Sequence, residues 1–132
     1  MNLPFGPPTG TRNPHAEGAA AELAAELHLR RLGYRIVGKN VRAGGGELDL
    51  VAIEGDTLCF IEVKARRAGS FGAAVEAVGW DKRRRIERAA RGYLARQPFD
   101  GPCRIDVLGI ETGPGGELRF ELLRNAFEVG EG

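Results

Sequence analysis

Three charged side chains sit in two apolar segments that are separated by a short turn. Asp49 lies within 46–53 (GELDLVAI), and Glu62 and Lys64 lie within 57–64 (TLCFIEVK). Hard cations such as Mg²⁺ bind through one or two carboxylates, keep several waters and take phosphate oxygens as further ligands. A lysine two residues after a ligand could orient or deprotonate an attacking water, or stabilise charge on a phosphate. These residue types therefore indicate a site that hydrolyses phosphodiesters.

The two segments are expected to pair as a β-hairpin. The turn between them contains Gly55-Asp56, and glycine adopts the positive φ that tight hairpin turns need. If these two residues form the loop, antiparallel counting places Asp49 opposite Glu62. Directly opposed side chains lie roughly 5 Å apart at Cβ, and like charges there are destabilising. A fold that places two carboxylates so close usually has a cation between them.

The same polar positions also have alternative explanations. The register places Glu47 opposite Lys64, and Glu-x-Lys on one strand face usually marks a solvated face with cross-strand ion pairing. Against this, Asp49 and Glu62 lie in otherwise apolar strands that should be central, where an unpaired carboxylate is costly. Glu22, on a helix expected to pack over the hairpin, could add a carboxylate to the same metal, and Glu47 could do so instead.

Apolar spacing and turn residues predict the elements that position these groups. Helices are expected over 16–32 and from about 78 or 80 to 97, and strands over 34–41, 46–53, 57–64, 104–110 and 117–123. Strands that are apolar on both faces belong in the middle of a sheet that helices cover on each side. Three strands in a row predict a mixed sheet. The expected fold class is therefore α/β, with the last strand at an edge.

Each expected helix has apolar residues at helical spacing. In the first helix these are Ala16, Ala20, Leu23 and Leu27, and in the second they are Ile86, Ala89, Ala90, Tyr93 and Leu94.

The length of 132 residues suits one domain with a core of ordinary size. We expect a single domain over 14–127, a disordered tail at 1–13 that is rich in Pro, Gly, Thr and Asn, and a flexible tail at 128–132. We expect neither a secretory signal nor a membrane span, because no basic region precedes an apolar block and no apolar run is long enough. Cys59 and Cys103 lie in apolar runs and predict buried, reduced thiols in a cytoplasmic protein.

Positive charge is concentrated on the second helix, although the formal net charge is only +1. The helix carries seven basic residues against Asp81 and Glu87. A solvated helix face is the ordinary explanation, but so large an excess near a phosphodiester site favours neutralisation of a nucleic-acid backbone. Nothing indicates base readout, so structure-selective or non-specific binding is expected. The expected phosphate contacts are Arg66, Arg67, Lys82, Arg83, Arg84, Arg85 and Arg88.

A series of short blocks runs along the chain from about Gly18 to Phe127. The blocks are Gly18 with Glu22, Gly33-Tyr34, Asn40-Val41-Arg42, 46–52 (GELDLVA), 60–66 (FIEVKAR), Phe71-Gly72 with Glu76-Ala77-Val78, Lys82, 104–107 (RIDV) and Asn125-Ala126-Phe127. In these blocks the chain resembles the YraN-like family of small bacterial proteins. Through that family it is similar to the PD-(D/E)xK nuclease superfamily, which includes Holliday-junction resolvases and restriction endonucleases.

The resemblance implies a restriction-endonuclease-like three-layer core, a mixed central sheet flanked by helices. It implies Mg²⁺ or Mn²⁺ bound by Asp49 and Glu62, with Lys64 as the catalytic lysine. Glu22 matches the additional helix carboxylate of resolvase-like members. The residue before the first acid is Leu48 rather than the proline in the superfamily's name, which is often absent. Resolvase-like relatives are often two-fold dimers, so the resemblance also implies a homodimer.

These expectations combine into a divalent-metal-dependent endonuclease that hydrolyses phosphodiester bonds in structured or branched DNA. The alternative is a nucleic-acid-binding or adaptor module that keeps the nuclease-like fold without catalytic turnover. A third interpretation is a protein-interaction domain whose charges are structural. Only the first requires a cation site that is destroyed when Asp49 or Glu62 is replaced.

Overall fold

The computed structural model describes residues 14–67 and 80–127. Along the chain the elements are α1 (Pro14–Arg31), β1 (Arg35–Ala43), β2 (Gly46–Glu54), β3 (Thr57–Arg67), α2 (Trp80–Arg96), β4 (Cys103–Thr112) and β5 (Leu118–Phe127). Every expected helix and strand is therefore present, with ends that differ by a few residues. The expected tails at 1–13 and 128–132, and the blocks within 68–79, lie outside the described residues. No described helix is long and apolar enough to cross a membrane.

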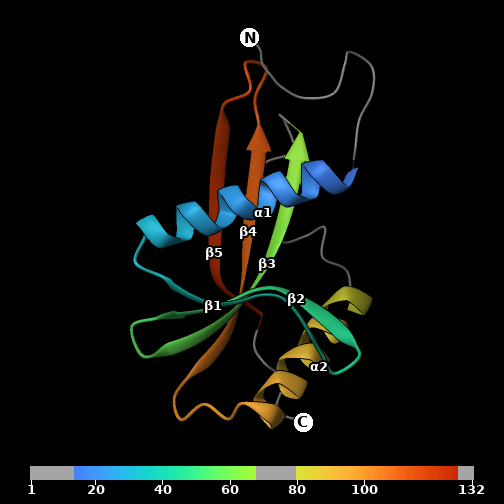
Figure 1. Ribbon diagram of the computed structural model, residues 1–132, viewed down its shortest axis with the longest axis vertical. Helices are drawn as coiled ribbons and strands as arrows, with labels where there is room; N and C mark the ends of the chain where they lie inside the picture. Colours follow the sequence, from blue (N-terminus) through green and yellow to red (C-terminus); the bar gives the residue numbers. More distant parts are fainter. Residues whose placement is uncertain (1–13, 68–79, 128–132) are drawn as a thin grey trace.

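The strands form one mixed sheet in the order β1-β2-β3-β4-β5. β1, β2 and β3 are antiparallel neighbours. β3 and β4 are parallel neighbours in the sheet, and α2 lies between them along the chain. β5 is antiparallel to β4. α1 crosses β3, β4 and β5 and also contacts β1, whereas α2 lies against β1 and β2 (Figure 1). The two helices cover separate hydrophobic clusters. This is the restriction-endonuclease-like three-layer α/β core that the resemblance implies.

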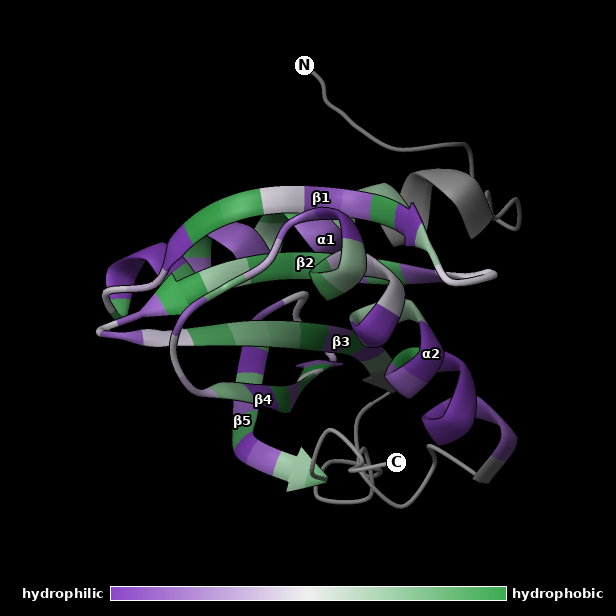
Figure 2. Cartoon of the chain, turned by 90° about the horizontal axis from the view of Figure 1, so that it is seen from below, coloured by the Kyte–Doolittle hydropathy of each residue, from purple (hydrophilic) through white to green (hydrophobic). Residues whose placement is uncertain are grey.

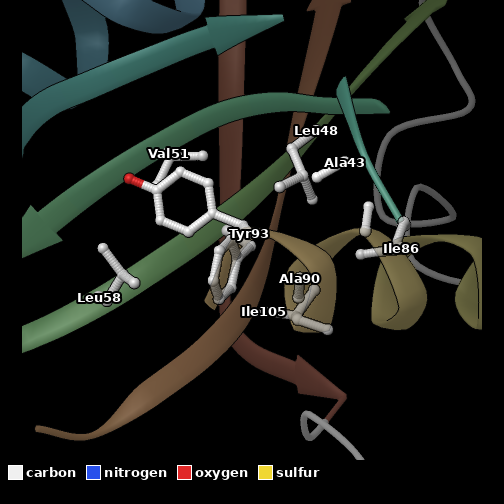
Figure 3. Close-up of a cluster of buried hydrophobic side chains, with 10 residues drawn as sticks. Ala43, Leu48, Val51, Leu58, Ile86, Ala90, Tyr93 and Ile105 are labelled. Carbon is white, nitrogen blue, oxygen red and sulfur yellow. The ribbon is translucent and has the colours of Figure 1, made fainter. Parts of the chain in front are cut away.

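α2 buries the apolar stripe predicted from its sequence. Tyr93 meets Phe60 of β3 edge to face, with the ring centroids 5.6 Å apart, which is a favoured aromatic geometry. Figure 2 shows α2 largely purple and the central strands largely green. The arginines at 84, 85, 88 and 91 are exposed, so the polar side of the helix faces outward. The cluster around Tyr93 includes Ala43, Leu48, Val51, Leu58, Ile86, Ala90 and Ile105 (Figure 3).

α1 leaves exposed three of the residues whose spacing stood out in the sequence, namely Ala20, Leu23 and Leu27. Leu23 and Leu27 are 57% and 46% exposed, and the core contacts come from Ala25 and Leu29 instead. Glu26 is also buried, and ion pairs with basic residues of α1 and β1 compensate its charge. Alanine and leucine occur on several faces of this helix, so their spacing alone does not identify the buried face.

A charged network joins the end of the hairpin to β4 and β5. The fully buried carboxylate of Asp106 accepts hydrogen bonds from the Tyr34 hydroxyl at 3.1 Å and from Arg104 Nε at 2.9 Å. Glu54, the last residue of β2, forms ion pairs with Arg104 and Arg124. Hydrogen bonds from Arg124 and, to a smaller extent, from Arg104 lower the pKa of Glu54 to about 2, against burial that would raise it.

This network predicts a pH-dependent contribution of Glu54 to stability. Its pKa is lower in the folded chain than the ordinary 4.5, so the stabilisation is present above pH 4.5 and is lost as the pH falls toward 2. We expect Glu54→Gln to lower the free energy of unfolding by about 2 kcal/mol at neutral pH, and by much less in acid. Urea unfolding across the acidic range measures this, with the exposed Asp100→Asn as control. An equal loss at every pH would contradict an electrostatic origin.

Two glycines fix α2 against the turn between β1 and β2. A Cβ added at Gly92 would lie 2.5 Å from the backbone nitrogen of Gly44. Gly44 itself has a φ of +57°, and a Cβ there would clash with the carbonyl oxygen of Arg88. The close approach of the two backbones therefore requires glycine on both sides.

Gly92→Ala tests this close approach. Helix propensity alone would make alanine the better residue by about 1 kcal/mol, whereas a clash with backbone atoms typically costs about 1–3 kcal/mol. We expect the clash to dominate and the free energy of unfolding to fall. The exposed Ala95→Gly is the matched control, because it should lose only the propensity of about 1 kcal/mol. A more stable Gly92→Ala protein would show that the backbones are not in contact.

Candidate metal centre

The hairpin between β2 and β3 has the register expected from its turn. Glu54 pairs with Thr57, Gly55 has a φ of +64°, and the pairing continues to Leu50 opposite Ile61. The ladder stops beyond that pair. The expected pairings of Asp49 with Glu62 and of Glu47 with Lys64 are therefore not part of the ladder.

The Asp49 side chain ends the ladder by taking the place of a backbone acceptor. Its Oδ2 accepts a hydrogen bond from the backbone N–H of Val63 at 2.8 Å. In a continued antiparallel ladder this N–H would bind the carbonyl oxygen of Leu48. Leu48 and Leu50 are two positions apart, yet they belong to different hydrophobic clusters. β2 therefore stops alternating regularly at Asp49, where it parts from β3.

Glu62 is held in this centre by a lysine of α2. Its side chain is only 5% exposed, and its Oε2 lies 3.0 Å from Nζ of Lys82. Burial, and next the charge of Glu62, raise the pKa of Asp49 to about 7. The N–H of Val63 and the charge of Lys82 act in the opposite direction on the same carboxyl. The centre thus combines two carboxylates and one ammonium group at the edge of the core.

Glu22 reaches toward this pair from α1. Its charge also raises the pKa of Asp49, so it lies within electrostatic reach. Among the described residues, however, no three His, Cys, Asp or Glu side chains are grouped closely enough to hold one metal ion. Two carboxylates are enough for Mg²⁺, which keeps several waters and takes phosphate oxygens as ligands. Asp49 and Glu62 therefore fit a divalent cation, with Glu22 at a greater distance.

Lys64 and Glu47 both lie beyond the end of the β2–β3 ladder. Lys64 lies two positions after Glu62 on β3, so both side chains project from the same face of the sheet. Lys64 is partly buried, and within residues 14–67 and 80–127 its ammonium forms no ion pair. Glu47 is exposed and lies opposite Arg42 of β1. The ion pair between Glu47 and Lys64 that the sequence suggested is therefore absent from the described residues.

The basic residues at the start of α2 divide between two environments. Lys82 points to Glu62 in the metal centre, rather than standing free at the surface. Arg84, Arg85 and Arg88 are exposed, and together with Asp81 they line a surface hollow. The three arginines are therefore accessible at the surface.

The remaining predicted phosphate contacts have different positions. The guanidinium of Arg83 lies over the ring of Phe127, 4.9 Å from its centroid, and so joins α2 to β5. Arg66 and Arg67 are the last two residues of β3, and in the sequence they directly precede the segment 68–79, which lies outside the described residues.

Two partners in this centre could not be identified from the sequence. The N–H of Val63 carries no residue-type signal, because any backbone could donate in its place. Lys82 was expected to contact phosphate, and its pairing with Glu62 depends on where α2 docks. The one available signal is indirect: a carboxylate in a central strand requires a compensating charge.

Comparison with known proteins shows the family of this chain. The model of the uncharacterised protein family UPF0102 matches residues 21–110, which include Asp49 and Glu62. A UPF0102 protein of Symbiobacterium thermophilum is 49% identical over 113 residues, covering 85% of this chain and 96% of the relative. A relative in Ectopseudomonas mendocina is 42% identical over 114 residues, covering 85% of this chain and 94% of the relative. One in Cupriavidus metallidurans is 43% identical over 115 residues, covering 86% and 82%. These matches confirm the YraN-like resemblance, and the chain belongs to the uncharacterised bacterial protein family UPF0102.

Proposed function

We propose that the chain is a divalent-metal-dependent endonuclease that hydrolyses phosphodiester bonds in structured or branched DNA. The observation that carries the proposal is the pair of Asp49 and Glu62, brought together where β2 parts from β3. Lys82 supplies one positive charge to a pair that carries two negative charges when ionised. The remaining charge destabilises the fold unless a further cation compensates it. The resemblance to PD-(D/E)xK nucleases supports the same assignment.

Each group in the centre has a distinct part in this proposal. Asp49 and Glu62 would hold Mg²⁺ or Mn²⁺, which supplies Lewis acidity and a bound water of lowered pKa. Lys64, on the same face as Glu62, would orient the attacking water or stabilise charge on the phosphate. The exposed arginines of α2 would neutralise the DNA backbone without base readout. Because a branched substrate requires two cuts, a homodimer is part of the proposal.

A second candidate is a nucleic-acid-binding or adaptor module without catalytic turnover. It is favoured by the ion pair between Lys82 and Glu62, which already compensates part of the charge in the centre. This candidate predicts salt-dependent binding that needs no divalent ion and survives replacement of Asp49. A protein-interaction domain, by contrast, would show no affinity for nucleic acid even at low salt.

Cleavage by an isosteric variant tests the proposed activity. Asp49→Asn keeps an oxygen that can accept the N–H of Val63, but it removes the charge that a cation requires. We expect it to slow cleavage by about two orders of magnitude or more, because the cation supplies much of the transition-state stabilisation. Four-way junction, flap and single-stranded substrates with Mg²⁺ or Mn²⁺ provide the measurement, and Asp100→Asn is the exposed control. No cleavage of any substrate, or equal cleavage by wild type and Asp49→Asn, would refute the nuclease.

The affinity for a cation should depend on pH in a defined direction. The pKa of Asp49 is raised to about 7, so this carboxyl is mostly protonated at pH 6 and mostly ionised at pH 8. Only the ionised form is a ligand, and Mn²⁺ affinity should therefore rise about tenfold over this range. Calorimetric titration with Mn²⁺ measures the rise, and Asp49→Asn should abolish binding. An affinity that stays constant with pH would show that Asp49 is not a ligand.

A further inference from the structure

Lys82 already pairs with the carboxylate of Glu62 on which a divalent cation would bind. The ammonium nitrogen of Lys82 lies 3.0 Å from Oε2, the distance of a direct ion pair. A cation bound to this carboxylate would lie within a few ångströms of the ammonium group, where two positive charges repel strongly in a partly buried site. Both cannot contact Glu62 equally well, so they compete for it.

The two partners differ in how freely they can move. Glu62 is in a central strand and is 5% exposed, whereas Lys82 is in the first turn of α2 and is 40% exposed. A lysine side chain is flexible and can turn its ammonium group into water at small cost. In the competition, Lys82 is therefore the group that leaves and Glu62 the group that stays.

The surroundings of Lys82 favour a second, anionic partner after it leaves. Arg85 follows three positions later on the helix, a spacing at which side chains are neighbours, and it is exposed. Arg85 also lines the hollow formed with Arg84 and Arg88. An ammonium group turned away from Glu62 would add to this basic surface, which suits a phosphate backbone.

We propose that Lys82 is an exchangeable counter-ion, which neutralises Glu62 until a divalent cation binds and then turns outward to contact backbone phosphate. Binding of the cation and binding of DNA are thereby linked through one side chain. The inference deepens the proposed function and rests on its metal site. In this scheme Lys82 balances the charge of Glu62 or of the phosphate backbone, and it takes no part in bond making or breaking.

Chemical labelling of the wild-type protein tests the release directly. The chain has three lysines, Lys39, Lys64 and Lys82, so acetylation of each can be followed by peptide mass spectrometry. Mn²⁺ should accelerate acetylation of Lys82 severalfold, because its ammonium group loses its carboxylate partner. Lys39 is the internal control, since its pairing with Glu26 at 3.3 Å lies outside the metal centre. An unchanged rate at Lys82 under conditions where Mn²⁺ binds would overturn the inference.

A charge-matched pair of variants provides the second measurement. At pH 8, Lys82→Gln should bind Mn²⁺ about tenfold more tightly than wild type, because the competing charge is gone. Arg84→Gln removes the same charge from the exposed face and should change the affinity by less than about twofold. Equal or weaker binding by Lys82→Gln would overturn the exchange and make Lys82 a structural support. If wild type binds no Mn²⁺, the proposed metal site fails and this inference fails with it.

Discussion

The hydrogen bond from the backbone N–H of Val63 to the carboxylate of Asp49 interrupts the regular pairing of β2 with β3 and creates the carboxylate centre. By supplying an acceptor from a side chain, it releases β2 from β3 without leaving this N–H unsatisfied. β1 adapts at the same level, since Asn40, which lies between the paired residues Lys39 and Val41, has a φ of +51°. The local irregularity therefore spans two neighbouring strands, and Asp49 stands at its centre.

Two charged clusters in this small fold illustrate opposite electrostatic situations. At one end of the hairpin, two arginines lower the pKa of Glu54 to about 2, so the charged form is stabilised by folding. In the carboxylate centre the pKa of Asp49 is raised to about 7, so folding favours the protonated form and its ionisation at neutral pH costs stability. The fold therefore compensates the negative charge of Glu54 well, whereas it compensates that of Asp49 incompletely. Incomplete compensation next to basic groups is typical of functional sites.

Local rules predicted much of this arrangement. The two-residue turn at Gly55-Asp56 set the register as far as Leu50 opposite Ile61, because hairpin pairing follows directly from loop length. The amphipathic pattern of α2 identified its buried face for a similar reason, since one stripe is apolar and the rest is charged. α1 has apolar residues on several faces, and tertiary contacts decided which of them are buried, so Leu23 and Leu27 remain exposed.

The sequence did not predict the end of the β2–β3 ladder or the partner of Lys82. The ladder ends because a side chain competes successfully with a backbone carbonyl for one N–H, and residue alternation contains no information about that competition. The ion pair of Lys82 with Glu62 depends on the docking of α2, which the contact of Gly44 with Gly92 fixes far along the helix. Both features arise from contacts between segments that are distant in sequence.

The docking of α2 also explains why one short basic segment can serve two purposes. Successive residues of an α-helix are turned by about 100°, so Lys82 and Arg84 project in nearly opposite directions. The apolar stripe of α2 packs on the sheet, and Lys82 shares that side of the helix, so it faces Glu62. Arg84 and Arg88 remain exposed. A basic run that was interpreted from its sequence as one phosphate-binding surface is thus divided by helical geometry. Lys82 enters the carboxylate centre, Arg83 packs on Phe127, and Arg84, Arg85 and Arg88 form the basic surface, so the orientation of a single helix determines all three positions.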